Sequence, residues 1–273
     1  MSETTPSRSF PDAGRISILS ATILLAYVLA RIINLPGLEL ASQLPGFYFQ
    51  IDINIGTVVA VLVAWLTASG AVWLLHDHPA LKDKNLVQHW LLPSLTALVI
   101  GLPLSQMPLN AAWWVALAIG GAILMIVLVA EYISVNPEDV FHAPATVVLT
   151  AISFALFLAL VVTLRVASLR LYLLMPAVFF AIGLVSLRTL NLRLHGRWAL
   201  YQSLVIALFI TQLAAALHYL PLQPVIFGLI LLGPAYALTS LIYNIMSGMR
   251  FSQAITEPIL VLLIVWGFTL WIR

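Results

Sequence analysis

Glu131 is a carboxylate whose position local structure does not explain. It lies at the end of an apolar run, within the stretch from Met125 to His142. The C-terminal end of a helix carries partial negative charge, so a carboxylate there is expected to need a cationic partner. Arg188 is our first candidate partner, and Arg250 is the alternative. Such a pair would either fix the register of two helices or hold a group that accepts a proton or contacts a substrate.

The residues after Glu131 include a second carboxylate and a histidine that could act as an acid and a base. Asn136-Pro137 is typical of a helix cap followed by the first helical residue. This predicts that the fifth helix begins there, with Glu138 and Asp139 in its first turn, where negative charge is favourable. Glu131 or Asp139, together with His142, would then be the candidate catalytic groups of an interfacial enzyme.

Arginines on the same side could hold an anion for such an enzyme. Guanidinium groups bind phosphate through two parallel hydrogen bonds. The substrate would be lipid-linked or would carry a phosphate. The candidate residues are Arg188, Arg193 and Arg197.

A second set of charged residues falls on the opposite side of the predicted membrane. The segment from Pro36 to Asp52 carries two carboxylates and no Lys or Arg, so two arginines from later in the chain could pair with it. An unpaired charge in hydrocarbon costs about 2.5 to 3.5 kcal/mol on insertion scales. The set forms either interfacial ion pairs or an outer substrate site, and it comprises Arg31, Glu39, Asp52, Arg165 and Arg170.

Gly233-Pro234 interrupts the middle of an apolar run. Proline removes one helix hydrogen bond and clashes with the preceding turn, so it should kink the helix and loosen carbonyls near Leu229 and Ile230. Broken helices form substrate and ion sites in transporters. The motif is therefore either a plain kink or the binding site of a carrier.

Metal and cofactor sites are not expected. The chain has no cysteine, which excludes disulfides, thiolate metal sites and a cysteine nucleophile. His76-Asp77-His78 stands in a polar loop, where paired histidines are usually solvated. No Gly-rich phosphate loop, nucleophile elbow or H-E-x-x-H motif is present, and no Lys lies in an apolar run.

The composition indicates that helices crossing a membrane must position these residues. The 273-residue chain is 62% apolar and 8% charged, with a mean hydropathy of +1.07. A helix of about 20 apolar residues crosses a bilayer. Nine candidate spans result, or eight if the proline-containing third run is re-entrant. They are Ile16–Leu35, Ile53–Leu75, Trp90–Leu104, Ala111–Ile133, Pro144–Leu164, Leu171–Leu187, Trp198–Tyr219, Pro224–Met246 and Pro258–Ile272.

The distribution of basic residues predicts the orientation. With nine spans and a cytoplasmic N-terminus, most Lys and Arg residues between spans face the cytoplasm, as the positive-inside rule requires. Arg165, Arg170 and Arg273 would lie outside. Tryptophans would form belts at both interfaces.

A stripe of small residues runs along the second span. Small residues at every fourth position let another helix approach closely. The stripe could bind a neighbouring helix, a protein partner or a second copy, and it comprises Gly56, Ala60, Ala64 and Ala68.

We therefore predict an all-α, polytopic transmembrane bundle. A polar tail of residues 1–15 would precede one domain of residues 16–273 in a bacterial-type plasma membrane (a cell inner membrane). The lipid bilayer is the expected partner, and nucleic acid is not, because basic clusters are lacking. The favoured role is a non-enzymatic subunit or scaffold of a membrane complex. The alternatives are a transporter of an apolar or weakly polar solute and the interfacial enzyme described above.

Overall fold

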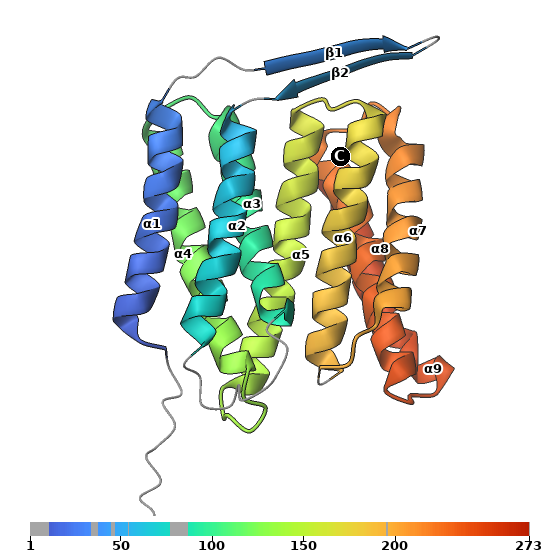
Figure 1. The fold of residues 1–273 in the computed structure, drawn as a ribbon. Helices are drawn as coiled ribbons and strands as arrows, with labels where there is room; N and C mark the ends of the chain where they lie inside the picture. Colours follow the sequence, from blue (N-terminus) through green and yellow to red (C-terminus); the bar gives the residue numbers. More distant parts are fainter. Residues whose placement is uncertain are drawn as a thin grey trace, which may run out of the picture. The chain divides into compact units, whose positions relative to one another are not determined.

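The chain forms two compact groups of helices. The computed structural model describes residues 11–33, 38–44, 47–53, 55–76, 87–194 and 196–272. By contact, the chain divides into Met1–Val135 and Asn136–Arg273, which we call the first and second units (Figure 1). The sequence-based boundaries, a tail to residue 15 and one domain after it, stay a prediction. Residues 1–10 of that tail lie outside the described residues.

The first unit contains four long helices and one hairpin. Helix α1 begins three residues earlier than the predicted span because Asp12 caps it, accepting a hydrogen bond from the Gly14 N–H at 2.9 Å. The elements are α1 (Ala13–Ile32), β1 (Leu38–Leu44), β2 (Phe47–Ile53), α2 (Ile55–Leu75), α3 (Val87–Gln106) and α4 (Ala111–Ser134).

A hairpin lies between the first two long helices. Strands β1 and β2 are antiparallel, with Leu38 opposite Ile53 and Leu44 opposite Phe47. Apolar residues at 47, 49, 51 and 53 alternate with polar or aromatic ones, which is the period of a strand. The alternation explains why this segment pairs as a hairpin.

Helix α3 lies along the small-residue stripe of α2. A Cβ atom added to Gly56 would lie 2.5 Å from the Ser105 Cβ, and one added to Gly101 would lie 2.9 Å from the Ala60 Cβ. The close approach predicted for the stripe therefore occurs within the chain at Gly56 and Ala60. Of the other two stripe residues, Ala64 is buried and Ala68 is half-buried. Binding of a separate protein or a second copy through this stripe stays a prediction.

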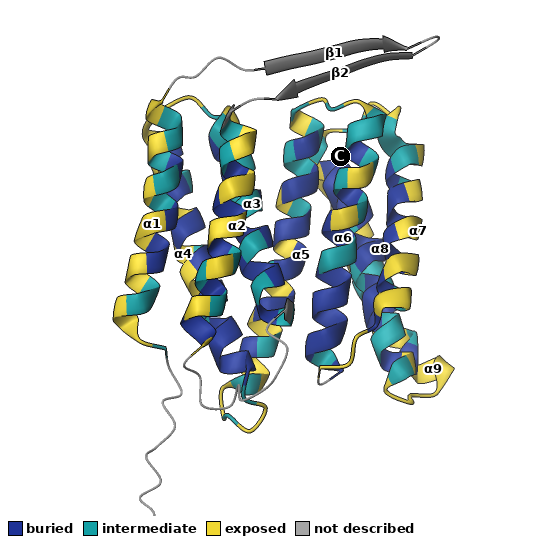
Figure 2. Ribbon diagram, viewed as in Figure 1, coloured by how far each residue is buried: buried dark blue, intermediate teal, exposed yellow. Residues whose placement is uncertain are grey.

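The second unit contains five long helices and one short one. Helix α8 contacts α5, α6, α7 and α10, so it is central to this unit, while α10 packs on α8 and α9. Figure 2 shows buried stripes along the helices, separated by exposed ones. The elements are α5 (His142–Val166), α6 (Leu171–Arg193), α7 (Leu200–His218), α8 (Pro224–Met246), α9 (Phe251–Ala254) and α10 (Thr256–Ile272).

The predicted start of the fifth helix is wrong. Helix α5 begins at His142, whereas residues 136–141 form turns. The Asn136 side chain accepts from the Glu138 N–H at 3.2 Å, and the Asp139 side chain accepts from the Phe141 N–H at 2.9 Å. Asn and Asp side chains that bind the backbone two residues ahead stabilise turns in competition with a helix.

The predicted fold class is confirmed. Eight helices are long and apolar enough to cross a membrane, as expected for a polytopic helical bundle. Helix α3 is not among those eight; it carries Pro93 and Pro103 yet remains one continuous helix of 20 residues. From Gln88 to Ser105 none of its residues is exposed, so the surrounding protein covers this less apolar helix.

Candidate functional site

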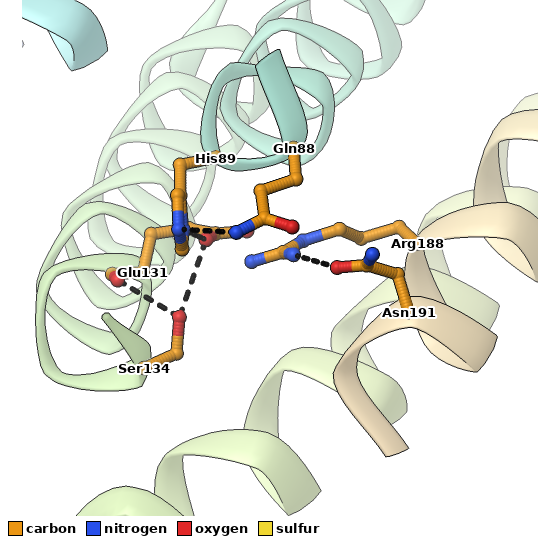
Figure 3. Close-up of polar contacts among 6 residues, drawn as sticks. All are labelled: Gln88, His89, Glu131, Ser134, Arg188 and Asn191. Carbon is orange, nitrogen blue, oxygen red and sulfur yellow. Dashed lines mark hydrogen bonds and ion pairs between the residues drawn. The ribbon is translucent and has the colours of Figure 1, made fainter. Parts of the chain in front are cut away.

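Glu131 forms a buried pair with His89 in the first unit. Glu131 lies in the last turn of α4, and His89 lies in the first turn of α3. The His89 Nδ1 atom is 3.0 Å from the Glu131 Oε2 atom (Figure 3). The two residues are 5% and 1% exposed. A charged or titratable pair excluded from water in this way is a candidate functional site.

Two further side chains complete this cluster. The Ser134 hydroxyl donates to the Glu131 carbonyl at 2.9 Å and lies 3.4 Å from its Oε2 atom. On the other side of the imidazole, the Gln88 Nε2 atom lies 3.1 Å from the His89 Nε2 atom. We call these four residues, Gln88, His89, Glu131 and Ser134, the His–Glu cluster.

The cluster assigns a tautomer to the neutral imidazole. A carboxylate can only accept, so the Nδ1 atom of His89 carries the hydrogen that points to Glu131. The amide nitrogen of Gln88 can only donate, so the His89 Nε2 atom is the acceptor. Protonation of that atom would require the Gln88 amide to rotate and present its oxygen.

The same arrangement explains how Glu131 is tolerated at a helix end. The carboxylate stands at the C-terminal end of α4, where the dipole of α4 is unfavourable. Its partner belongs to the first turn of α3, and the N-terminal end of a helix carries partial positive charge. The first turn of α3 thus offsets the unfavourable end of α4.

Sequence reasoning missed His89 as the partner of Glu131. The histidine follows the predicted polar loop that contains His76 and His78, and it stands two residues before an apolar stretch that begins at Leu91-Leu92. Its neighbour Trp90 was taken as the start of the third span, whereas α3 begins at Val87. A helix begun three residues earlier would have placed His89 inside it.

Arg188 is buried in the second unit. It lies within Val185–Leu192, where every residue is buried, and is itself 2% exposed. Its Nη1 atom donates to the Asn191 Oδ1 atom at 3.2 Å; Figure 3 also draws this pair. Helix α6 continues to Arg193, so Arg188 is more than one turn from the helix end. The predicted pairing of Glu131 with Arg188, or with Arg250, stays a prediction.

The remaining inner candidates lie around the helix ends of the second unit. His142 is the first residue of α5, and Asp139 is engaged in the preceding turn. Arg193 ends α6, and its guanidinium carbon lies 5.9 Å from the ring centre of Tyr236 and 5.4 Å from that of Tyr243. Arg197 is exposed in the following connection. A joint catalytic role for Asp139 or Glu131 with His142 stays a prediction.

Arg165, from the predicted outer cluster, caps a helix end in the second unit. Its Nη1 atom donates to the His218 carbonyl and its Nη2 atom to the Leu220 carbonyl, both at 2.8 Å. Its guanidinium carbon also lies 5.0 Å from the ring centre of Phe227. These carbonyls belong to the end of α7 and the segment after it, where arginine commonly binds. Arg165 therefore has a structural role at the end of α7, and its predicted pairing with an outer carboxylate stays a prediction.

The other outer residues occupy separate elements. Arg170 precedes α6, and its carbonyl accepts from the backbone of Leu173 and Leu174. Arg31 lies in the last turn of α1. Glu39 and Asp52 are register partners in the hairpin. An outer substrate site built from these residues stays a prediction.

Gly233 and Pro234 form the contact between α8 and α10. The indole Nε1 atom of Trp266 lies 3.4 Å from the Ile230 carbonyl, which is the acceptor freed by Pro234 four residues later. A Cβ atom on Gly233 would lie 3.1 Å from that same nitrogen and 3.1 Å from the Leu262 Cδ1 atom. This favours the interpretation of the motif as a packing site for Trp266.

Metal ligands do not gather in the part of the chain that the structure describes. No group of three or more His, Asp or Glu side chains there could hold a metal ion. Asp77 and His78 of the predicted polar loop lie outside the described residues.

Comparison with known proteins gives one match. A family model described as "Protein of unknown function (DUF5656)" matches residues 35–272, which include every helix from α2 to α10 and the hairpin. No curated protein and no solved structure matches the chain. The description of the family names no activity, so the residues themselves must carry a functional argument.

Proposed function

We propose that this chain, which belongs to the DUF5656 family, is a non-enzymatic subunit or scaffold of a complex in the plasma membrane, with its N-terminus in the cytoplasm. Its partner would be a protein that contributes a transmembrane helix to the outer face of α10. The observation that carries this proposal is the environment of one glycine, Gly267.

Most of the helical glycines in the described part of the chain serve close contacts. A Cβ added to Gly70 would lie 2.1 Å from a Leu19 methyl carbon, and one added to Gly120 would lie 2.6 Å from an Ile100 methyl carbon. Among the described helical residues, Gly267 is the exception, because nothing lies within 4 Å of its added Cβ. Glycine inside a helix costs about 1 kcal/mol relative to alanine. In membrane helices, glycine offsets this cost by allowing another helix to approach closely.

Helix α10 has the surface that such a partner would need. Only Pro258 and Thr269 are buried along α10. Leu263 and Leu270, which flank Gly267 by about one turn on either side, are 64% and 71% exposed. Large side chains around a glycine offer a helix both a hollow and apolar contacts. These features support a partner helix at this position.

Site-specific photo-crosslinking in native membranes tests the proposal. A photoreactive amino acid at Leu263 should give one defined adduct with a partner protein. The matched control is Phe180 on α6, which is 65% exposed and should label lipid alone. The substitution Gly267→Leu should abolish the protein adduct without lowering the thermal stability of the purified chain, because the added side chain meets open space.

Two outcomes would contradict the proposal. Identical, diffuse labelling from both positions would mean that lipid covers α10. An adduct of twice the mass of the chain would mean self-association in place of a separate partner.

A second candidate, a proton-linked carrier of a weakly polar solute, is favoured by the buried His–Glu cluster. Intramembrane acid–base pairs commonly serve as proton relays in transporters. In proteoliposomes with an internal pH dye, the wild-type chain should dissipate a proton gradient faster than Glu131→Gln, while Glu138→Gln, which changes an exposed carboxylate, should match the wild type. Equal rates for empty and wild-type vesicles would remove this candidate.

A further inference from the structure

One end of the second unit carries an arginine held between two tyrosines. Arg193 ends α6, and Tyr236 and Tyr243 stand seven residues apart on α8, so they project from the same face of that helix. The guanidinium carbon lies 5.9 Å and 5.4 Å from their ring centres. A guanidinium over aromatic faces is attracted by the negative charge density of the rings.

The tyrosine contacts leave the guanidinium donors available. A guanidinium carries five N–H donors, and its attraction to an aromatic ring does not require a hydrogen bond from any of them to an acceptor atom. Within the described residues, the contacts of Arg193 are these two rings, and its side chain is half-buried. A preoriented guanidinium with available donors matches the geometry of phosphate oxygens.

A carboxylate stands on the far side of one of these tyrosines. The Tyr236 hydroxyl donates to the Glu257 Oε1 atom at 3.0 Å, and the Tyr236 ring packs edge-on against Phe154 with a centre distance of 5.2 Å. A carboxylate offers about four acceptor positions, so this single bond leaves capacity for a further donor. Tyr236 thus contacts a positive group through its ring and a negative group through its hydroxyl.

Three residues of this cluster lie in the first or last turn of a helix, whereas Tyr236 lies in the body of α8. Arg193 is the last residue of α6, Tyr243 lies in the last turn of α8, and Glu257 lies in the first turn of α10. The connection between α8 and α10 exposes Met249 and Phe251, at 47% and 64%. Exposed apolar side chains beside charged ones at helix ends are typical of segments that contact the membrane interface.

We propose that Arg193 and Glu257 bind the headgroup of an amine-bearing phospholipid, with the phosphate on Arg193 and the ammonium on Glu257. The headgroup carries one positive and one negative charge, and the site offers a group of each opposite sign, both in contact with Tyr236. A phospholipid with an anionic headgroup would satisfy Arg193 and meet repulsion from Glu257. This inference does not depend on the partner proposed for α10.

Native mass spectrometry of the delipidated full-length chain tests the site. Phosphatidylethanolamine and phosphatidylglycerol with identical acyl chains are titrated separately. The wild type should bind phosphatidylethanolamine more tightly. Arg193→Gln should weaken that binding about tenfold, because a charge-assisted contact is lost. Arg197→Gln removes the same charge from an exposed residue in the connection between α6 and α7. It should change the affinity for phosphatidylethanolamine less than about twofold.

Glu257→Gln is expected to remove selectivity. It should bring the affinities for the two lipids within about twofold of each other, because the ammonium loses its charged acceptor while the phosphate contact stays. If Arg193→Gln fails to fold, Arg193→Lys carries the test: it keeps the charge, loses the planar fork, and should still weaken binding several-fold.

Three results would overturn the proposal. The first is unchanged phosphatidylethanolamine binding in Arg193→Gln, or in Arg193→Lys where that variant carries the test. The second is an equal loss of binding in the Arg193→Gln and Arg197→Gln variants. The third is equal affinity of the wild type for the two lipids. Soluble glycerophosphoethanolamine and inorganic phosphate serve as competitors. Displacement of the lipid by either one at equal concentration would assign the site to a soluble phosphate and overturn the assignment to a lipid.

Discussion

One buried contact between helices of the first unit differs in its chemistry from two contacts between helices of the second unit. In the first unit, the ends of α3 and α4 are joined by an imidazole and a carboxylate, His89 and Glu131. Two contacts of the second unit instead use an indole and an amide that face backbone carbonyls: Trp266 lies against the Ile230 carbonyl, and Asn244 donates to the Ala254 carbonyl at 3.0 Å. Both partners of the first contact exchange protons, whereas amides and indoles do not near neutral pH. A change of pH can therefore act on the first unit in a way that these contacts of the second unit do not allow.

The largest expected effect is that of Glu131→Ala. The substitution leaves the His89 N–H without its acceptor in a buried position and should destabilise the protein by about 3 kcal/mol. Glu131→Gln keeps an acceptor oxygen and should cost about 1 kcal/mol. Thermal unfolding in detergent measures both.

The matched control for that series is Glu138→Ala. Glu138 is exposed in the turn before α5, so its loss should change stability by less than about 0.5 kcal/mol. Equal stability of Glu131→Ala and the wild type would show that the His89–Glu131 pair does not hold α3 to α4. The proposed difference between this contact and those of the second unit would then be wrong.

An intermediate effect is expected for Arg165→Gln in the second unit. The change removes both hydrogen bonds to the His218 and Leu220 carbonyls. It should lower the free energy of unfolding by about 2 kcal/mol, because the donor of both bonds is a charged group. Thermal unfolding in detergent measures the loss. Arg170→Gln, at the exposed start of α6, is the control for loss of charge at this end.

The smallest expected effect is that of Trp266→Phe. It keeps most of the aromatic surface and removes the indole donor from the Ile230 carbonyl, so the expected cost is about 1 kcal/mol. Unfolding midpoints at two pH values check it. A cost that grows on acidification would contradict the view that this contact of the second unit is insensitive to protons.

Helix positions followed from the sequence more closely than helix contacts did. The eighth span was predicted at the same residues as α8, and the fourth ended one residue before α4 does. Apolar run length sets these bounds directly, because each residue adds about 1.5 Å to a helix that must cross the membrane. The predicted bounds were too short where polar residues continue a helix inside the protein, as from Leu187 to Arg193 in α6.

Two further errors, the predicted start of α5 and the missed hairpin, arose where a short sequence pattern fits two backbone conformations. The Asn136 cap was predicted from residue type, yet Asn136 and Asp139 each bind backbone two residues ahead and delay α5 to His142. The hairpin was missed although residues 47–53 alternate in polarity, because proline and glycine nearby favoured a loop. In both places, one short pattern was compatible with two backbone conformations of similar energy.

The sequence by itself determined the membrane class, most of the helix bounds and the need of Glu131 for a partner, since each follows from composition, run length or the charge at a helix end. Only the tertiary structure decided that His89, 42 residues earlier, is a partner within the first unit. It also decided that Trp266 takes the place beside Gly233 and Pro234. Such contacts join residues far apart in the chain, and helix packing selects them among many candidates of the same chemical type.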